Sequence, residues 1–262
     1  MQSTMKKRQQ HWSLRLFIGL ILIFSGLFAV ALATGNQIVF LSTKIAVVPV
    51  VLTLYFSRIK YMPNLFFSVF LLFFLGHALE VVNDRFFSDT LSKCAYLASY
   101  SLLILVLIKK IKHVKFEGLV SLYLVFVCLL NSYFLYVFYD VVRDNFTSNL
   151  DMVFYILKST IMIGMCFLAF TVYLSQETKQ SIIFLAMSFC FVFADVLHYV
   201  TDLYVYYWLF DWMGNSLQLV GLFVLLTYVT NHNGKISLVA TEKSLSTVKP
   251  FKSRELKSEV TQ

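Results

Sequence analysis

Two strongly apolar segments of the sequence each contain a triplet of carboxylate and imidazole side chains. The triplets are His77, Glu80 and Asp84 in one segment, and Asp195, His198 and Asp202 in the other. Residues three, four and seven apart share one face of a helix, so each triplet forms a polar stripe. In a low-dielectric pocket such groups can act as general acids and bases. The spacing therefore predicts proton-transfer chemistry, with Asp195, His77, Glu80 and His198 as the catalytic candidates.

The composition places these stripes in membrane helices. The 262 residues are 59% hydrophobic and 14% charged, whereas a soluble domain is about 45–50% apolar and about 25% charged. This excludes a disordered chain and a typical soluble enzyme. Apolar stretches near 20 residues recur, and each can cross a bilayer core of about 30 Å. We predict an all-α, polytopic membrane protein with eight spans, at about 14–34, 38–56, 65–83, 92–108, 119–139, 152–174, 181–201 and 209–230.

The basic residues give the orientation. With the N-terminus in the cytoplasm, 17 of the 22 Lys and Arg fall on the cytoplasmic side, 3 fall outside and 2 lie within spans. This bias predicts that both termini are cytoplasmic. It also explains the net charge of +8 through the membrane surface, without nucleic acid as a partner. We expect a basic N-terminus over 1–13, a membrane domain over 14–230 and a disordered cytoplasmic tail over 231–262, in the plasma membrane or a bacterial inner membrane.

The ionisable groups within spans all fall in the outer half of the membrane. Lys44 and Lys158 lie about two turns from the outer ends of the second and sixth spans, at the depth of the two stripes. A shift of 118 residues aligns His77 with Asp195. This predicts a parallel repeat of four plus four spans, related by an axis along the membrane normal. The third and seventh spans would then meet at the centre and enclose one pocket.

Structural roles for the same residues remain open. His77 with Glu80, or Asp195 with His198, can be local ion pairs that fasten helices together. For Lys158 the structural interpretation is favoured, because Asp151 and Tyr155 lie on its helix face. The stripes also contain zinc-ligand residue types, but no HExxH or other compact ligand motif is present. We therefore predict no metal and no cofactor.

Short motifs at these positions resemble the YhhN family of lysoplasmalogenase-like membrane proteins. Segment 42–49 (STKIAVVP) is similar to the family's Lys-Pro segment, and 75–79 (LGHAL) lies where the family has a Gly-Asp pair. Segments 193–197 (FADVL) and 215–219 (NSLQL) resemble its Ser-Asp motif and its final-helix Tyr/Gln segment. The resemblance covers about 38–230. Two departures stand out: His77 replaces the family's first Asp, and the proline is displaced to Pro49.

The resemblance implies hydrolysis of the vinyl ether of a lysoplasmalogen, which releases a fatty aldehyde and a glycerophospho-base. Asp195 is then expected to activate water and His77 to supply the proton, while Glu80 and His198 orient them. Lys44 is expected to meet the phosphate of the lysophospholipid. The other substrate-binding candidates are Asp84, Asp202 and Gln218.

Two other classes of function stay in view. One is an integral membrane protein without catalysis, in which the loss of the family's Asp marks a lost site or another substrate. The other is a transporter or channel for a lipid or small molecule. The inner halves of the predicted spans lack ionisable groups, which disfavours a polar path across the membrane.

Overall fold

A computed structural model of the protein describes residues 2–57, 59, 61–81, 87–111, 119–145, 149–203 and 206–248. These ranges contain eight α-helices and no β-strand. The helices are α1 (Gln2–Thr34), α2 (Gln37–Phe56), α3 (Asn64–Leu79), α4 (Phe87–Ile111), α5 (Leu119–Asn145), α6 (Asn149–Gln176), α7 (Lys179–Leu203) and α8 (Trp208–Val248). An all-helical chain satisfies its backbone hydrogen bonds within each segment, as a bilayer core requires.

Six of the described helices, namely α1, α2, α4, α6, α7 and α8, are long and apolar enough to cross a membrane. The protein is accordingly an all-helical, multi-pass membrane protein. The other two helices, α3 and α5, have shorter apolar segments. Helix α3 has 16 residues and is about 24 Å long, and the apolar part of α5 is Leu122–Tyr133. The order of the helices follows the eight predicted spans.

A two-residue reversal between α1 and α2 sets the depth of Lys44. Gly35 has a φ of +65°, and the amides of Gly35 and Asn36 donate to the carbonyls of Leu32 and Ala31, which together form a Schellman motif. Asn36 then caps α2, because its side chain accepts a hydrogen bond from the Val39 amide at 3.2 Å. Helix α2 therefore starts immediately, with Lys44 two turns from its beginning.

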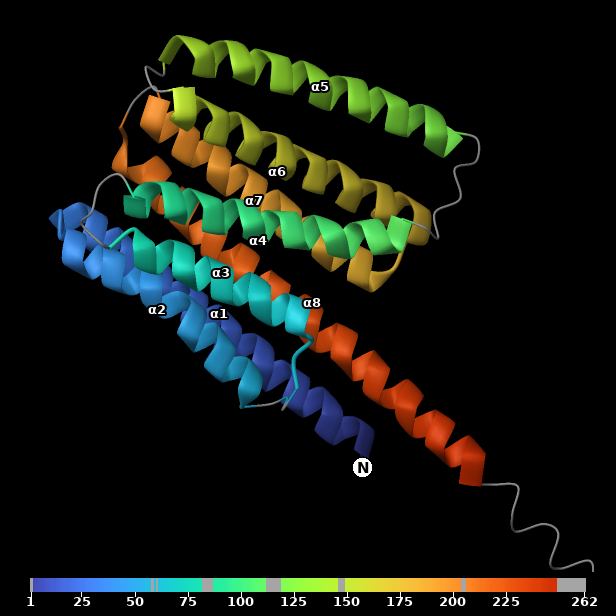
Figure 1. Cartoon of the computed structure of the whole chain (residues 1–262). Coiled ribbons are helices and arrows are strands. Elements are labelled where there is room, and N and C mark those ends of the chain that lie inside the picture. The colour runs from blue at the N-terminus through green and yellow to red at the C-terminus, as the bar shows by residue number, and fades with distance from the viewer. Residues whose placement is uncertain are drawn as a thin grey trace, which may run out of the picture.

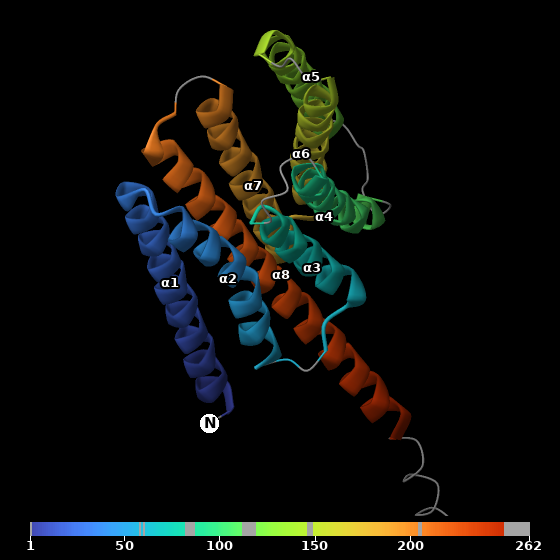
Figure 2. The same ribbon diagram turned by 60° about the vertical axis from the view of Figure 1, so that its left-hand side comes forward.

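The helices surround a central pair (Figure 1 and Figure 2). Helices α7 and α8 lie side by side; α1 and α2 pack near α8, and α3 and α4 continue the bundle toward α6. Helix α5 lies at the outer edge against α6. The first residues of α1 and the last residues of α8 lie at the same end of the bundle.

Three aromatic rings close the centre of the bundle. Phe73 of α3 stacks on Phe191 of α7 with ring centroids 5.5 Å apart. Tyr100 of α4 meets the edges of both rings at 5.4 and 5.6 Å. All three side chains are fully buried. Helices α3 and α7 thus meet through side chains one turn below His77 and Asp195, as the predicted pocket requires.

Helix α8 differs from the prediction at its C-terminal end. The apolar span was expected to end near 230, with a disordered tail from 231, but the helix continues to Val248. Its residues beyond Asn231 become mostly polar, and no proline occurs before Val248 to stop the helix. Residues 249–262 of the predicted tail lie outside the described residues.

Candidate functional site

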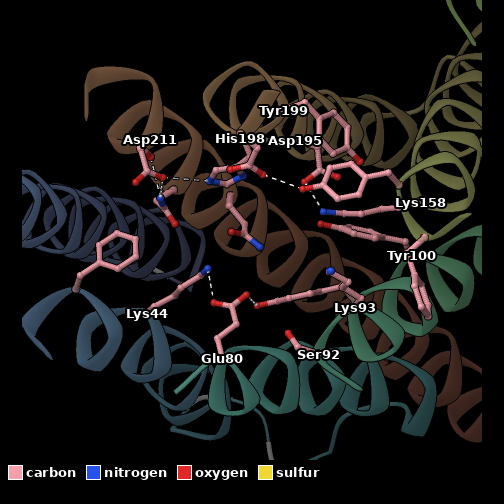
Figure 3. A pocket seen from close by; sticks show the side chains of 17 residues that line it. Lys44, Glu80, Ser92, Lys93, Tyr100, Lys158, Asp195, His198, Tyr199 and Asp211 are labelled. Atoms are coloured by element: carbon pink, nitrogen blue, oxygen red, sulfur yellow. Dashed lines mark hydrogen bonds and ion pairs between the residues drawn. The ribbon is translucent and has the colours of Figure 1, made fainter. Parts of the chain in front are cut away.

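A polar cavity of about 310 Å³ lies between the helices (Figure 3). Six structural elements contribute to its wall: α2, the end of α3, α4, α6, α7 and α8. Its ionisable and amide-bearing lining residues include Lys44, Glu80, Tyr96, Lys158, Asp195, His198, Asp202, Asp211, Asn215 and Gln218. The volume falls within the range of small-molecule binding sites, which starts at about 300 Å³.

One wall of the cavity carries a fully partnered carboxylate. Lys44 of α2 donates to Oε2 of Glu80 at 2.5 Å, and the hydroxyl of Tyr96 donates to Oε1 at 2.9 Å. Both oxygens of Glu80 therefore have a donor. The pairing explains why a lysine is tolerated at this depth, since charges within a membrane protein pair with each other.

The opposite wall carries a carboxylate with one open oxygen. Lys158 of α6 lies 3.1 Å from Oδ1 of Asp195 on α7. The rings of Tyr96 and Tyr199 lie 5.9 and 5.8 Å from the Lys158 ammonium and hold it by cation–π attraction. Oδ2 of Asp195 is buried and has no hydrogen-bond partner among the described residues. A buried acceptor without a donor is costly, so Oδ2 is available for a ligand or a water molecule.

Helix α8 supplies a third wall with a fixed amide. The Nδ2 group of Asn215 donates to Oδ1 of Asp211 at 2.9 Å and to the Asp211 carbonyl at 2.8 Å. These two acceptors define which end of the amide is the nitrogen. The Oδ1 atom of Asn215 is therefore the inward acceptor, and it too is buried without a partner among the described residues. Gln218 lies one turn along the same face.

His198 lies between the second and third walls (Figure 3). Its Nε2 atom is 3.8 Å from Oδ1 of Asp211. The ring also lies against the backbone of α8, where a Cβ on Gly214 would come within 2.9 Å of Nε2. Only glycine permits this approach at residue 214, so the sequence of α8 is matched to the imidazole on α7.

His77 is in a different position from the one its stripe suggested. It is 3% exposed and lines a second, much smaller cavity with Asn215 and Gln218, rather than the wall of the large one. Its Nδ1 atom lies 2.5 Å from the Tyr96 hydroxyl. Because that hydroxyl gives its single proton to Glu80, Nδ1 must be protonated and donate to the hydroxyl oxygen.

Of the remaining predicted site residues, two line the large cavity and one does not lie in the described part of the chain. Asp202 and Gln218 line the large cavity, where Asp202 accepts a hydrogen bond from the Tyr155 hydroxyl at 3.0 Å. Asp84 lies outside the described residues. The ion pairs join different helices, Lys44 to Glu80 and Lys158 to Asp195. The local ion-pair interpretation assumed that His77 pairs with Glu80, or Asp195 with His198. Among the ion pairs given for the described residues, neither of these two pairs occurs.

Several residues of the site were not singled out by sequence reasoning. Tyr96 links Glu80 to His77, and Asp211 and Asn215 form the α8 wall. Lys158 was assigned to Asp151 and Tyr155 on its own helix, but it contacts Asp195 of α7. A signal existed for α8, because residues 211, 215 and 218 follow a helical face. No comparable signal marks Tyr96 among many buried tyrosines.

The cavity therefore brings an open carboxylate, an imidazole and two paired lysines to one lining surface. Among the described residues no group of three or more His, Cys, Asp or Glu has the geometry of a metal site. Comparison of the chain with protein-family models, with curated proteins and with solved structures gives no match.

Proposed function

We propose that the protein is a membrane-embedded lipid hydrolase that cleaves the vinyl ether of lysoplasmalogens, as its resemblance to the YhhN family implies. The single observation that carries the proposal is the Oδ2 atom of Asp195, a buried carboxylate oxygen without a donor on the wall of a polar cavity. Its counterpart Glu80 has donors on both oxygens. Of the two paired carboxylates, Asp195 is the one with a free atom for chemistry.

The chemistry requires a base and an acid. A proton added to the β carbon of the enol ether leaves a cation at the α carbon, which water attacks. Asp195 Oδ2 takes the proton of that water. The hemiacetal then breaks its bond to the glycerol oxygen and gives a fatty aldehyde and a glycerophospho-base. Imidazole is the natural proton donor near neutral pH, and the two histidines that line the cavities described above are His77 and His198.

The cavity is suited to the polar end of a lysophospholipid. Lys44 has three N–H donors, so it can contact a phosphate while it donates to Glu80. Asp202 of α7 and Gln218 of α8 also line the cavity and offer further polar contacts. The volume of about 310 Å³ suits a headgroup and the reacting bond, and the alkyl chain would extend into the bilayer, where it is already solvated.

We also propose that α3 and α5 cross the membrane, which gives eight spans, a four-plus-four repeat and cytoplasmic termini. The shift of 118 residues that relates His77 to Asp195 also relates Phe73 to Phe191, the two rings that stack at the centre. An even number of spans agrees with the two helix ends that lie at one end of the bundle. The Lys and Arg bias supports a cytoplasmic location for that end.

A transport function has less support. Tyr100, which lines the cavity, packs with Phe73 and Phe191 as three fully buried rings. A transporter needs a polar path or a broken helix that lets one form, and these rings make the layer one turn below Asp195 aromatic and tightly packed. A hydrolase needs no such path.

The experiment is an assay of purified protein in nanodiscs with lysoplasmalogens and the matching ester lysophospholipids. Mass spectrometry follows fatty aldehyde and fatty acid separately. We expect aldehyde from the vinyl ethers. Fatty acid without aldehyde would retain a lipid hydrolase and reject the vinyl-ether substrate. A folded protein that releases neither product would reject the hydrolase and favour a non-catalytic membrane protein.

A further inference from the structure

We propose that His198 is the proton donor of this reaction and that Asp211, Asn215 and Gly214 of α8 hold it in position; the assignment rests on the proposed function. Sequence reasoning gave the acid role to His77 and an orienting role to His198. The geometry of the two imidazoles favours the reverse assignment.

Access to the substrate separates the two histidines. His198 lines the large cavity, and its side chain is 25% exposed. His77 is 3% exposed, and its Nδ1 proton is committed to the Tyr96 hydroxyl. A general acid must reach the atom that it protonates within hydrogen-bond distance or through one water. Only His198 meets that condition for a substrate in the large cavity.

Residues of the neighbouring helix α8 hold His198 in position. Asn215 donates to Oδ1 of Asp211, and that same oxygen faces Nε2 of His198 at 3.8 Å. The close approach at Gly214 fixes the plane of the ring. The other ionisable groups that act on His198 are Lys44, Lys158, Glu80 and His77.

Asp195 completes the proton balance. It lies three residues before His198, so both groups project from one face of α7 into the cavity. The imidazolium gives its proton to the β carbon of the enol ether as the double-bond electrons form the new C–H bond. Water adds to the α carbon and gives its proton to Asp195, which forms the hemiacetal. The hemiacetal then loses its hydroxyl proton as the C–O bond to glycerol breaks, and the glycerol oxygen takes up one proton in exchange, so this step consumes no net proton. Transfer of that proton from Asp195 to His198 through water restores both groups.

The first test compares His198→Gln with His77→Gln in nanodiscs. General acid catalysis contributes about 10²–10⁴-fold, so we expect His198→Gln to lower kcat by at least about 100-fold. We expect His77→Gln to lower kcat by clearly less than His198→Gln does, once the rate is normalised to folded protein. Equal rates for wild type and His198→Gln, or the larger loss in His77→Gln, would overturn the assignment.

Two glycines of α8 provide a matched pair for the positioning role. A Cβ at Gly214 would meet His198, and a Cβ at Gly221 would meet Phe191, each at 2.9 Å. Both Ala variants disturb the contact between α7 and α8, but only one moves the imidazole. A misplacement of about 1 Å can cost about 100-fold in rate. We expect that Gly214→Ala loses activity per folded molecule and that Gly221→Ala retains it; similar rates in the two variants would contradict the positioning role.

A chemical readout tests access without catalysis. Diethylpyrocarbonate modifies neutral imidazoles that solvent can reach, and peptide mass spectrometry locates the modified ring. In the folded protein we expect modification of His198 and protection of His77. The opposite pattern would overturn the assignment even in an active enzyme. If wild type releases no aldehyde, the proposed function fails and the proton-donor role fails with it; aldehyde release that survives His198→Gln rejects the role alone.

Discussion

At the residue scale, the site depends on which oxygen atoms have donors. Glu80 and Asp195 are both paired with a lysine from a neighbouring helix, but only Asp195 keeps one oxygen open. Neither the residue type nor the helical spacing distinguishes the two carboxylates. The difference comes from Tyr96, whose hydroxyl occupies the second oxygen of Glu80. A single hydroxyl thus distinguishes the fully partnered carboxylate from the one with an open oxygen.

The pair of Lys158 and Asp195 makes a stability prediction. Lys158→Met leaves the buried Asp195 carboxylate without its partner. Breaking a buried ion pair costs about 3–5 kcal/mol, and Lys158 is 28% exposed, so we expect a loss near the lower value, about 3 kcal/mol. Unfolding in detergent measures it. The double variant Lys158→Met with Asp195→Asn should regain most of the loss, because no charge remains unpaired.

Lys179→Met serves as the control for this prediction, since Lys179 is exposed at the start of α7 and its loss should leave stability unchanged. An unfolding free energy of Lys158→Met equal to that of wild type would contradict the pairing. So would losses from Lys158→Met and Asp195→Asn that simply add in the double variant.

At the element scale, much of the fold was predictable from the sequence. The positions of all eight helices follow from apolar stretches and from polar links, and α1, α2, α6 and α7 agree with the predicted spans at most of their ends. The partners of the polar residues did not follow, because hydropathy gives depth in the membrane but not rotation about a helix axis. Lys158 illustrates this: its own helix offered partners, yet the packing of α6 on α7 directs it to Asp195.

Some glycines lie where two helices approach each other closely. A Cβ at Gly76 of α3 would lie 2.8 Å from the ring of Tyr96 on α4. At Gly164 of α6, a Cβ would meet nothing within 4 Å. The first contact positions the hydroxyl that Glu80 needs, and the second has no packing role among the described residues.

We therefore expect opposite effects from two identical substitutions. Gly76→Ala should destabilise the protein, because Tyr96 must move within a packed interface, at a cost of about 1–3 kcal/mol. Gly164→Ala should stabilise it by about 0.5–1 kcal/mol, the usual gain in a helix interior. Unfolding in detergent compares them. A neutral or stabilising Gly76→Ala would mean that α3 and α4 are further apart than described.

At the scale of the whole molecule, the polar cavity and the packed aromatic rings occupy different levels along the bundle. The polar cavity is lined by residues near the end of α3 and the start of α8, and the packed rings of Phe73, Phe191 and Tyr100 lie one helical turn from His77 and Asp195. This arrangement allows polar chemistry at the level of lipid headgroups while the rest of the bundle stays apolar. It also ties the proposed function to orientation, since the cavity must face the outer leaflet if the termini are cytoplasmic.

Orientation can be tested with single cysteines in a variant that lacks the four native ones. Gln37→Cys lies at the exposed start of α2, and Lys179→Cys lies at the exposed start of α7. A membrane-impermeant maleimide added outside intact cells should label Gln37→Cys only, and permeabilised cells should show both. Labelling of Lys179→Cys from outside would reverse the proposed orientation.

The most direct measurement is the rate of fatty aldehyde release from a lysoplasmalogen by wild type and by Asp195→Asn, at equal amounts of folded protein in nanodiscs. Asp140→Asn, which changes an exposed carboxylate of α5, is the matched control. Because Asn cannot accept a proton from water, we expect Asp195→Asn to lose at least about 100-fold in rate and Asp140→Asn to match wild type. An Asp195→Asn variant that releases aldehyde at the wild-type rate would contradict the central claim that the open oxygen of Asp195 performs the chemistry.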